Sequence, residues 1–187
     1  MVGIHATGAI DLAVTEALQS VASAPLDVLA NANTLVGQAP VTVAIAALLA
    51  YLAWRRGPRL GWLAIAPFVV LGAVGVALKV ALDHPPPPEA FSRSFWNPLG
   101  VTIATPSSFP SGHVARVTFL AIFAAALVRA CPTRIALALL VAYTFWARVY
   151  VGDHWASDAI GGLALGIAAG CVAVLWIDGR RAYDRRP

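Results

Sequence analysis

Charge is the property that this sequence has least of. Only 12% of its 187 residues are Asp, Glu, Lys or Arg, whereas 59% are hydrophobic, and the mean hydropathy is +0.76. A soluble globular domain carries about 25% charged residues. The shortage of charge therefore excludes an ordinary soluble domain and predicts an integral membrane protein.

Cysteine is also scarce. Cys131 and Cys171 are the two cysteines, and neither their mutual spacing nor their spacing from histidine is typical of a zinc site or of a disulfide framework. The sequence also has no carboxylate cluster that would suit magnesium. We therefore expect no metal and no other cofactor.

Lysine occurs once, against twelve arginines in an alanine-rich chain, which is typical of a GC-rich bacterial genome. The net charge of +4 could indicate a nucleic-acid partner. However, the basic residues form short clusters between apolar runs, a pattern that favours membrane topology instead. We expect a bacterial membrane protein that binds membrane lipids and no nucleic acid, and the sequence does not indicate its oligomeric state.

Long apolar runs are abundant. A helix needs about 20 apolar residues to cross a bilayer, because lipid offers no partner to unpaired backbone groups. This predicts an all-α, polytopic transmembrane helix bundle in a single domain, 1–187, with an outer loop over 83–110. The five predicted spans are 36–54, 60–82, 112–130, 134–150 and 157–177.

The segment 9–30 differs from the five runs, because its apolar residues follow one helical stripe and its polar residues lie opposite. It is predicted to be an amphipathic helix that lies in the membrane interface or packs on the bundle. Asp11, Glu16 and Asp27 make a sixth span costly, although a sixth helix remains the alternative.

Arginine clusters predict the orientation, since cytoplasmic loops keep an excess of positive charge. The segments 55–59, 129–134 and 180–186 hold nine of the thirteen Lys and Arg residues, and all three fall on one side if the five spans alternate. The loop 83–110 and the connection 151–156 then face away from the cytoplasm, on the periplasmic or extracellular side.

The stretch "SFPSGHVARV" at 108–117 places polar residues where a helix is predicted to begin. Ser111 is a favoured helix cap, and the unpaired N–H groups behind it form an anion site. Gly112 has no side chain to keep a phosphate oxygen from the backbone. His113 is then placed to donate a proton to a leaving oxygen. A capped helix with an interfacial histidine is the alternative interpretation.

A second cluster, "ARVYVGDHWASD" at 147–158, follows the fourth predicted span. If His154 begins the next helix, Asp158 lies one turn on and can hold its Nδ1–H, which leaves Nε2 nucleophilic. Arg148 can reach across the turn to grip phosphate oxygens in a bidentate manner. Asp153 is a competing partner for the histidine, and an ordinary Arg–Asp pair at a helix end is the alternative for the whole cluster.

Together these residues resemble the type 2 phosphatidic acid phosphatase superfamily of integral-membrane lipid phosphatases. Two of the family's three motifs are present with their spacing: "PSGH" at 110–113, and Arg148, His154 and Asp158. Ala147 stands where the family usually has a serine before that arginine.

The first family motif is incomplete. Lys79, near the outer end of the second predicted span, matches its lysine, but Pro86 stands where the family has an arginine. Arg116, one turn after His113, could occupy the vacancy, and Arg93 and His84 on the outer loop are alternatives.

The resemblance implies that His154 is a nucleophile that forms a phosphohistidine, that Asp158 orients it, and that His113 protonates the leaving group. It implies a phosphate site without metal, formed by Lys79, Ser111, Gly112 and Arg148, with Arg116 as the candidate fourth cation. The expected substrate is an undecaprenyl-type polyprenyl phosphate or diphosphate at the outer face of a bacterial cytoplasmic membrane. Phosphatidylglycerophosphate or phosphatidic acid phosphatase, a phosphotransferase, and a degenerate lipid-phosphate-binding protein are the alternatives.

Overall fold

The computed structural model describes residues 8–100, 107–128 and 130–183, and every regular element in these ranges is a helix. Seven α-helices and one short 3₁₀ helix, η1 (Glu89–Phe91), follow one another along the chain. The α-helices are α1 (Gly8–Gln19), α2 (Ala24–Gly37), α3 (Ala39–Arg56), α4 (Pro58–Ala81), α5 (Gly112–Leu127), α6 (Cys131–Tyr150) and α7 (Ala156–Tyr183).

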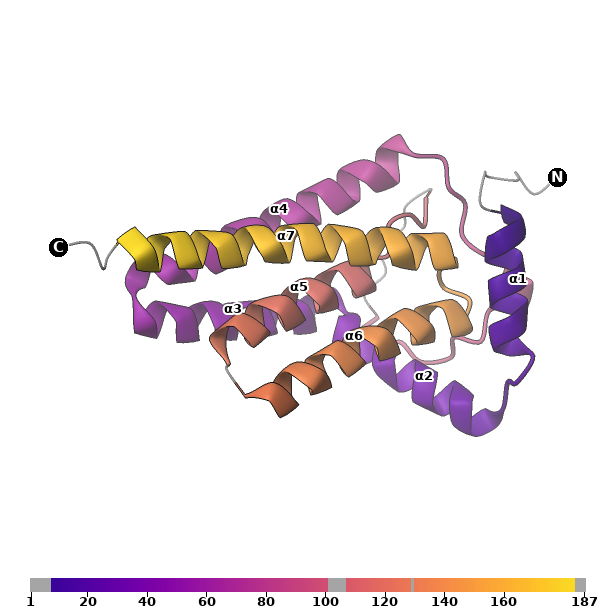
Figure 1. Ribbon diagram of the computed structural model, residues 1–187. Coiled ribbons are helices and arrows are strands. Elements are labelled where there is room, and N and C mark those ends of the chain that lie inside the picture. The colour runs from indigo at the N-terminus through magenta and orange to yellow at the C-terminus, as the bar shows by residue number, and fades with distance from the viewer. Residues whose placement is uncertain (1–7, 101–106, 129, 184–187) are drawn as a thin grey trace.

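Helices α3 to α7 run alternately up and down in one bundle (Figure 1). Helix α5 lies in its centre and packs against α2, α3, α4, α6 and α7. Its central place explains why apolar residues are buried over most of its length, from Val114 to Phe123. The end of α4, the start of α5, the end of α6 and the start of α7 lie at the same end of the bundle (Figure 1). The alternation thus brings distant sequence motifs together.

The bounds of α3 to α7 agree with the five predicted spans to within a few residues, except at the far end of α7. By length and hydropathy, one helix among the described residues can cross a membrane, Ala156–Ile177. A second candidate is the pair Ala24–Gly37 and Ala39–Arg55, which is bent by 54°. Ile65–Ala81 and Gly112–Leu127 are apolar but shorter. The number of five spans therefore stays a prediction.

The predicted helix over 9–30 is wrong as a single element, because the chain divides it into α1 and α2. The inward side of α1 is mixed. Asp11 is 1% exposed and Leu18 packs against the buried core, whereas Ile10 is 69% exposed. Asp11 is buried where it accepts hydrogen bonds from the start of α7. Helix α1 thus covers the end of the bundle (Figure 1).

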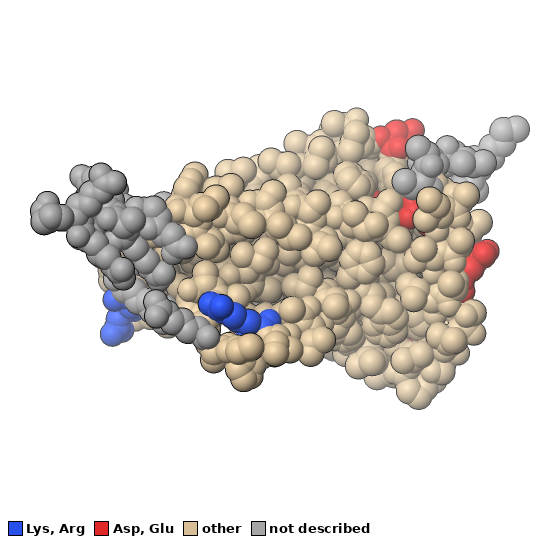
Figure 2. All heavy atoms as spheres, viewed as in Figure 1, with Lys and Arg blue, Asp and Glu red and all other residues tan. Residues whose placement is uncertain are grey.

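Large apolar side chains remain exposed along the bundle helices, including Trp62 at 71%, Val69 at 61%, Leu139 at 65% and Leu175 at 69%. The view in Figure 2 shows Lys and Arg toward one end of the molecule, Asp and Glu toward the other, and an uncharged band between them. A contiguous apolar surface of this kind is what a lipid-facing wall requires.

Helices α5 and α7 approach closely through a row of glycines on α7. A Cβ at Gly166 would lie 2.6 Å from the carbonyl oxygen of Ala115, and one at Gly162 would lie 2.4 Å from that of Ser111. At Gly170 it would lie 3.0 Å from Ile122. Since helices pack this closely only where side chains are small, the glycine row faces the inside of the bundle and holds α7 against the start of α5.

Gly166→Ala is expected to destabilise the protein by about 1–3 kcal/mol, because backbone atoms of α5 must move to admit the new methyl group. Gly72→Ala on α4 is the matched control, since a Cβ there meets nothing within 4 Å. Thermal unfolding in detergent measures both variants. Equal midpoints for the two would contradict the close contact between α5 and α7.

Candidate active site

A cavity of about 400 Å³ lies at the end of the bundle where α4, α5 and α6 present their polar residues. Six of the eight residues predicted for the site line it: Lys79, Gly112, His113, Arg116, Arg148 and His154. Asp158 and Ser111 are fully buried beside it rather than lining it. The two histidines, the cations and the start of α5 are therefore at one site.

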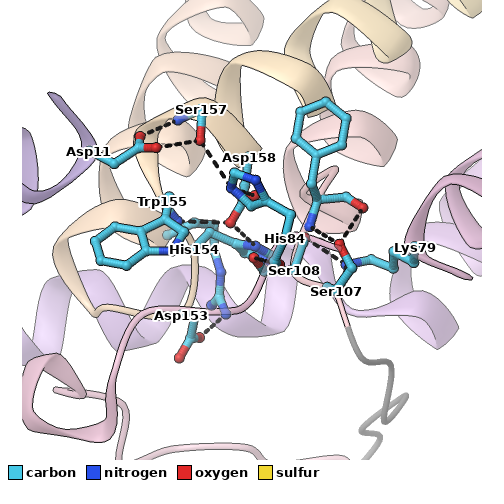
Figure 3. A network of polar contacts seen from close by, with 12 residues as sticks. Asp11, Lys79, His84, Ser107, Ser108, Asp153, His154, Trp155, Ser157 and Asp158 are labelled. Carbon is cyan, nitrogen blue, oxygen red and sulfur yellow. Dashed lines mark hydrogen bonds and ion pairs between the residues drawn. The ribbon is translucent and has the colours of Figure 1, made fainter. Parts of the chain in front are cut away.

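His154 lies just before α7, and its Nδ1 is 3.4 Å from Oδ2 of Asp158 (Figure 3). The helix begins at Ala156 rather than at His154. Asp158 occupies the third helical position, and its Oδ2 accepts the backbone N–H of Trp155 at 2.9 Å, as in half of a capping box. The carboxylate is thus fixed by the helix start, and Nε2 of His154 is left for a ligand.

The backbone of the α6–α7 turn is closed by the N–H of His154, which donates to the carbonyl of Arg148 at 3.2 Å. Gly152 in this turn has a φ of +73°, and a Cβ there would lie 2.2 Å from the carbonyl oxygen of Phe91. Both facts require glycine at this position. The turn therefore sets how far His154 stands from Arg148.

Arg148, in the last turn of α6, is 4% exposed. Its Nη1 donates to Oγ1 of Thr34 at 3.0 Å, and its Nη2 pairs with Asp153 (Figure 3). Asp153 is therefore the partner of the arginine rather than of His154. A buried guanidinium whose outer nitrogen meets a carboxylate at the cavity is suited to exchange that carboxylate for a phosphate.

The start of α5 differs in one respect from the prediction. Ser111 is the residue before the helix, but its side chain makes no capping hydrogen bond, and its Oγ is buried without a partner. The N–H of Ser111 instead donates to the carbonyl of Asp158 at 2.9 Å. The prediction of a side-chain cap is wrong, because the loop is held by α7. The first N–H groups of α5 still lack intrahelical acceptors.

His113 projects from the first turn of α5 toward the end of α2. Its ring packs so closely on Gly37 that a Cβ there would lie 2.2 Å from Cδ2. A backbone group of Thr34 hydrogen-bonds the ring, whereas Nε2 is buried without a partner. His113 thus presents one unpaired ring nitrogen at the cavity.

Lys79 reaches the cavity from the last turn of α4. Its Nζ donates to the carbonyl oxygens of Ser107 at 3.2 Å and Ser108 at 2.7 Å (Figure 3). The ammonium group is therefore anchored to the segment that leads into α5, with one donor left for a ligand, since an ammonium has three.

Arg116 lies over the start of its own helix, with Nη1 2.9 Å from where a Cβ of Gly112 would be. Its Nη2 donates to the carbonyl of Gly37 at 2.7 Å. Pro86 lines the same cavity. Arg93, by contrast, forms a two-bond ion pair with Asp27, at 2.7 and 3.0 Å. Of the candidate substitutes for the missing arginine, Arg116 is the cation that the cavity holds.

Sequence reasoning missed the contribution of α2 and of the residue that follows it, since Thr34 of α2 and Gln38, between α2 and α3, also line the cavity. It also missed that Asp11 of α1 contacts the start of α7. The one available signal was the acidic residue itself, because a carboxylate near a predicted span needs a partner.

Burial of the imidazole lowers the pKa of His154 below its usual value. The hydrogen bond that Nδ1–H of His154 donates to Asp158 opposes this effect, and the positive charge of Arg148 adds to it. The lowered pKa favours the neutral ring, which is the state in which a histidine nitrogen can act as a nucleophile.

Comparison with known proteins identifies the family of this chain. The sequence matches the PAP2 superfamily over residues 60–182, and the chain belongs to this family. It is a PAP2 lipid phosphatase, a class of membrane enzymes.

Three relatives illustrate the family. The chain is 29% identical over 153 residues to YbjG of Escherichia coli (strain K12), named as a candidate undecaprenyl-diphosphatase, with 76% of this chain and 73% of YbjG covered. The transmembrane PAP2-type phosphatidylglycerolphosphate phosphatase of Bacillus subtilis has a similar fold, with a TM-score of 0.76, 21% identity, and 96% and 89% of the two chains covered. Aquifex aeolicus LpxE gives a TM-score of 0.71, with 19% identity and 88% and 94% covered.

Proposed function

We propose that this enzyme hydrolyses a polyprenyl phosphate or diphosphate of the undecaprenyl type through a phosphohistidine on His154. The observation that supports this most is that one cavity is lined by two histidines, His113 and His154, together with the cations Lys79, Arg116 and Arg148. The similarity to YbjG supports the choice of substrate. The substrate phosphate occupies the cavity, and its tail remains in the lipid beside the bundle.

In the first step Nε2 of His154 attacks phosphorus and forms a P–N bond, while the bond from phosphorus to the leaving oxygen breaks. The leaving oxygen takes its proton from His113. Water then attacks phosphorus, its proton passes to His113, and the P–N electron pair returns to His154. Asp158 keeps the proton of His154 on Nδ1 throughout, which leaves Nε2 free for both steps.

The cations of the cavity stabilise the charge on the transferring phosphoryl group, which is the main task in this chemistry. Arg148 leaves Asp153 and binds phosphate oxygens instead. Lys79 donates its remaining N–H to the phosphate. The N–H groups at Gly112 complete the cradle, and the hydroxyl of Ser111, which is buried beside the cavity without a partner, turns toward the phosphate when it binds. Arg116 supplies the charge that the family's first motif normally provides at the position of Pro86.

The active site faces away from the cytoplasm in this proposal. The end of the bundle opposite the cavity carries the arginine-rich turn between α3 and α4 and the C-terminal end of α7 (Figure 1). Positive loops are retained in the cytoplasm, so the cavity lies at the outer surface of a bacterial cytoplasmic membrane.

A substrate panel tests the proposed function. Purified protein in detergent is expected to release inorganic phosphate fastest from undecaprenyl phosphate or diphosphate. Faster release from phosphatidylglycerophosphate or phosphatidic acid would change the assigned substrate but leave the proposed reaction mechanism as it is. A new phosphorylated product would indicate a phosphotransferase, and lipid binding without any release would indicate a degenerate member.

The lowered pKa of His154 predicts the acid limb of the pH profile. A protonated imidazole cannot attack phosphorus, so kcat/KM falls as the pH drops through the pKa of His154. Because burial lowers that pKa, we expect the limb below about pH 6.5, the value of an unperturbed histidine. The pH profile should be measured with two substrates whose phosphates have different pKa values, because a limb that belongs to the enzyme lies at the same pH for both. An acid limb shared by both substrates above pH 7 would contradict the prediction.

A further inference from the structure

Asp158 contacts a second histidine on the side away from His154. Its Oδ1 lies 3.1 Å from Nε2 of His84, a residue of the outer loop (Figure 3). The same Nε2 is 3.3 Å from Oγ of Ser157, which lies 2.7 Å from Oδ2 of Asp11. A continuous chain of polar contacts therefore runs from the nucleophile to the first helix of the protein.

The hydrogens of this chain can be assigned from the donors available. The hydroxyl of Ser157 has one hydrogen, and it donates to the carboxylate of Asp11, which has none to give. Ser157 can therefore only accept from His84. It follows that Nε2 of His84 carries a hydrogen, which it donates to Ser157. The same nitrogen lies 3.1 Å from Oδ1 of Asp158, which makes no hydrogen bond of its own. The N–H of His84 is thus in electrostatic contact with the carboxylate that orients His154.

His84 is held in place through its backbone and ring. Its carbonyl accepts the N–H of Ser108 at 2.8 Å and the Oγ–H of the same residue at 3.1 Å. The next carbonyl, that of Pro85, accepts the indole N–H of Trp155 at 2.9 Å. The ring of Phe109 lies beside the imidazole, with 5.7 Å between centroids. The loop is thus fastened to both α5 and α7 around this histidine.

Asp11 anchors the far end of the chain. It accepts the backbone N–H of Ser157 at 2.8 Å in addition to its hydroxyl, so α1 supplies a negative charge at the start of α7. At 1% exposure the carboxylate is shielded from water. Its position therefore depends on how α1 is seated on the bundle.

We propose that His84 is a positioning residue for the phosphatase reaction and that Asp11 of α1 sets its hydrogen-bonding state through Ser157. His84 fixes the free oxygen of Asp158 and takes a share of its negative charge, so the carboxylate holds His154 in orientation without making it too basic. Asp11 keeps the hydroxyl of Ser157 turned away from His84, which forces His84 to donate. This rests on the proposed role of His154 as nucleophile.

The charged groups that face His84 and Asp158 make the effect on pH testable. They are Asp158 and Asp11 from α7 and α1, His154 from the α6–α7 turn, Lys79 from α4, Arg148 from the last turn of α6 and His113 from the first turn of α5. Removing the imidazole of His84 leaves the whole charge of Asp158 to His154. The protonated form of His154 is then more stable, and the acid limb of the pH profile moves to higher pH.

The first experiment compares His84→Ala and His84→Gln in the full-length protein. For His84→Ala we expect kcat to fall about 10-fold, the size expected for one lost hydrogen bond to a buried charge. KM should change less than about 3-fold, and the acid limb of kcat/KM should move up. His84→Gln keeps a donor and should retain most of the wild-type kcat. Glu89→Ala, exposed on the same loop, is the control.

The second experiment tests the coupling. In Asp11→Asn the new amide can donate to Ser157 and turn its hydroxyl toward His84. Nε2 of His84 would then present a lone pair instead of an N–H to Oδ1 of Asp158, which lies 3.1 Å away. We expect a change in kcat and in the acid limb of the same direction as in His84→Ala. The double variant should have a kcat no lower than that of His84→Ala alone, since substitutions within one network of polar contacts do not have additive effects.

The proposal would be overturned by wild-type kcat and pH profile in His84→Ala, by a His84→Gln variant as impaired as His84→Ala, or by full additivity in the double variant. Loss of thermal stability in His84→Ala with no movement of the acid limb would show a structural role only, and would also overturn it. This test can be told apart from a failure of the proposed function. If His154→Ala keeps its activity, the assignment of the nucleophile is wrong. If His154→Ala is inactive and His84→Ala is unaffected, only the inference about His84 is contradicted.

Discussion

His154→Ala is expected to lower kcat by about 10⁴-fold or more, because it removes the atom that bonds to phosphorus. The cations of the cavity would remain, so the variant should still bind the lipid phosphate with a KM near that of the wild type. Release of inorganic phosphate from undecaprenyl phosphate measures the effect. The thermal midpoint should stay close to wild type, since the ring contributes one long hydrogen bond of 3.4 Å.

His113→Ala is the matched control, because it removes the proposed acid and leaves the nucleophile. Its activity should be partly restored on a phosphate ester such as p-nitrophenyl phosphate, whose leaving group needs no proton. The same ester should not restore His154→Ala. If both variants recover on the activated ester, or if neither does, the roles assigned to the two histidines are wrong.

Arg116→Ala is expected to lower kcat by about 10²-fold, in the range of losing one donor to a transition-state oxyanion. The reason is the position of Arg116 in the cavity, where the chain has Pro86 in place of the family's arginine. The more informative variant is the double substitution Arg116→Ala with Pro86→Arg. A guanidinium delivered from the other wall of the cavity should recover part of the lost activity.

Arg93→Ala is the control for this experiment. Arg93 is paired with Asp27 rather than with the cavity, so its loss should leave kcat nearly unchanged. Wild-type activity in Arg116→Ala would show that the enzyme works without a fourth cation. An Arg116→Ala variant that Pro86→Arg does not improve would show that Arg116 acts at a different place from the missing arginine.

The bundle and most of the site were predictable, since both follow from local patterns. Apolar runs of sufficient length predict the helices α3 to α7, and their alternation predicts that Lys79, Gly112, Arg148 and His154 lie at one end of the bundle, where the cavity is. The spacing of His154 and Asp158 in the sequence predicts a contact between their side chains, and the structure has one at 3.4 Å. The helix nevertheless begins at Ala156, two residues later than expected.

The contributions of α1 and α2 were not predictable in the same way. Periodicity gave one amphipathic helix over 9–30, and it could not show that the segment divides into two helices or that Asp11 turns inward toward α7. That outcome depends on tertiary contacts of Asp11. The side chain of Ser111 likewise gives up its capping role because the carbonyl of Asp158 holds its backbone. Such contacts join residues more than forty positions apart, which no local pattern records.

A structure with bound orthovanadate tests the central claim most directly, because vanadate takes the geometry of a transferring phosphoryl group. We predict one vanadate in the cavity, bonded to Nε2 of His154, with Nε2 of His113 on the opposite side and Arg148 released from Asp153 to bind its oxygens. Vanadate bound outside this cavity, or bound within it but out of reach of either histidine, would contradict the mechanism.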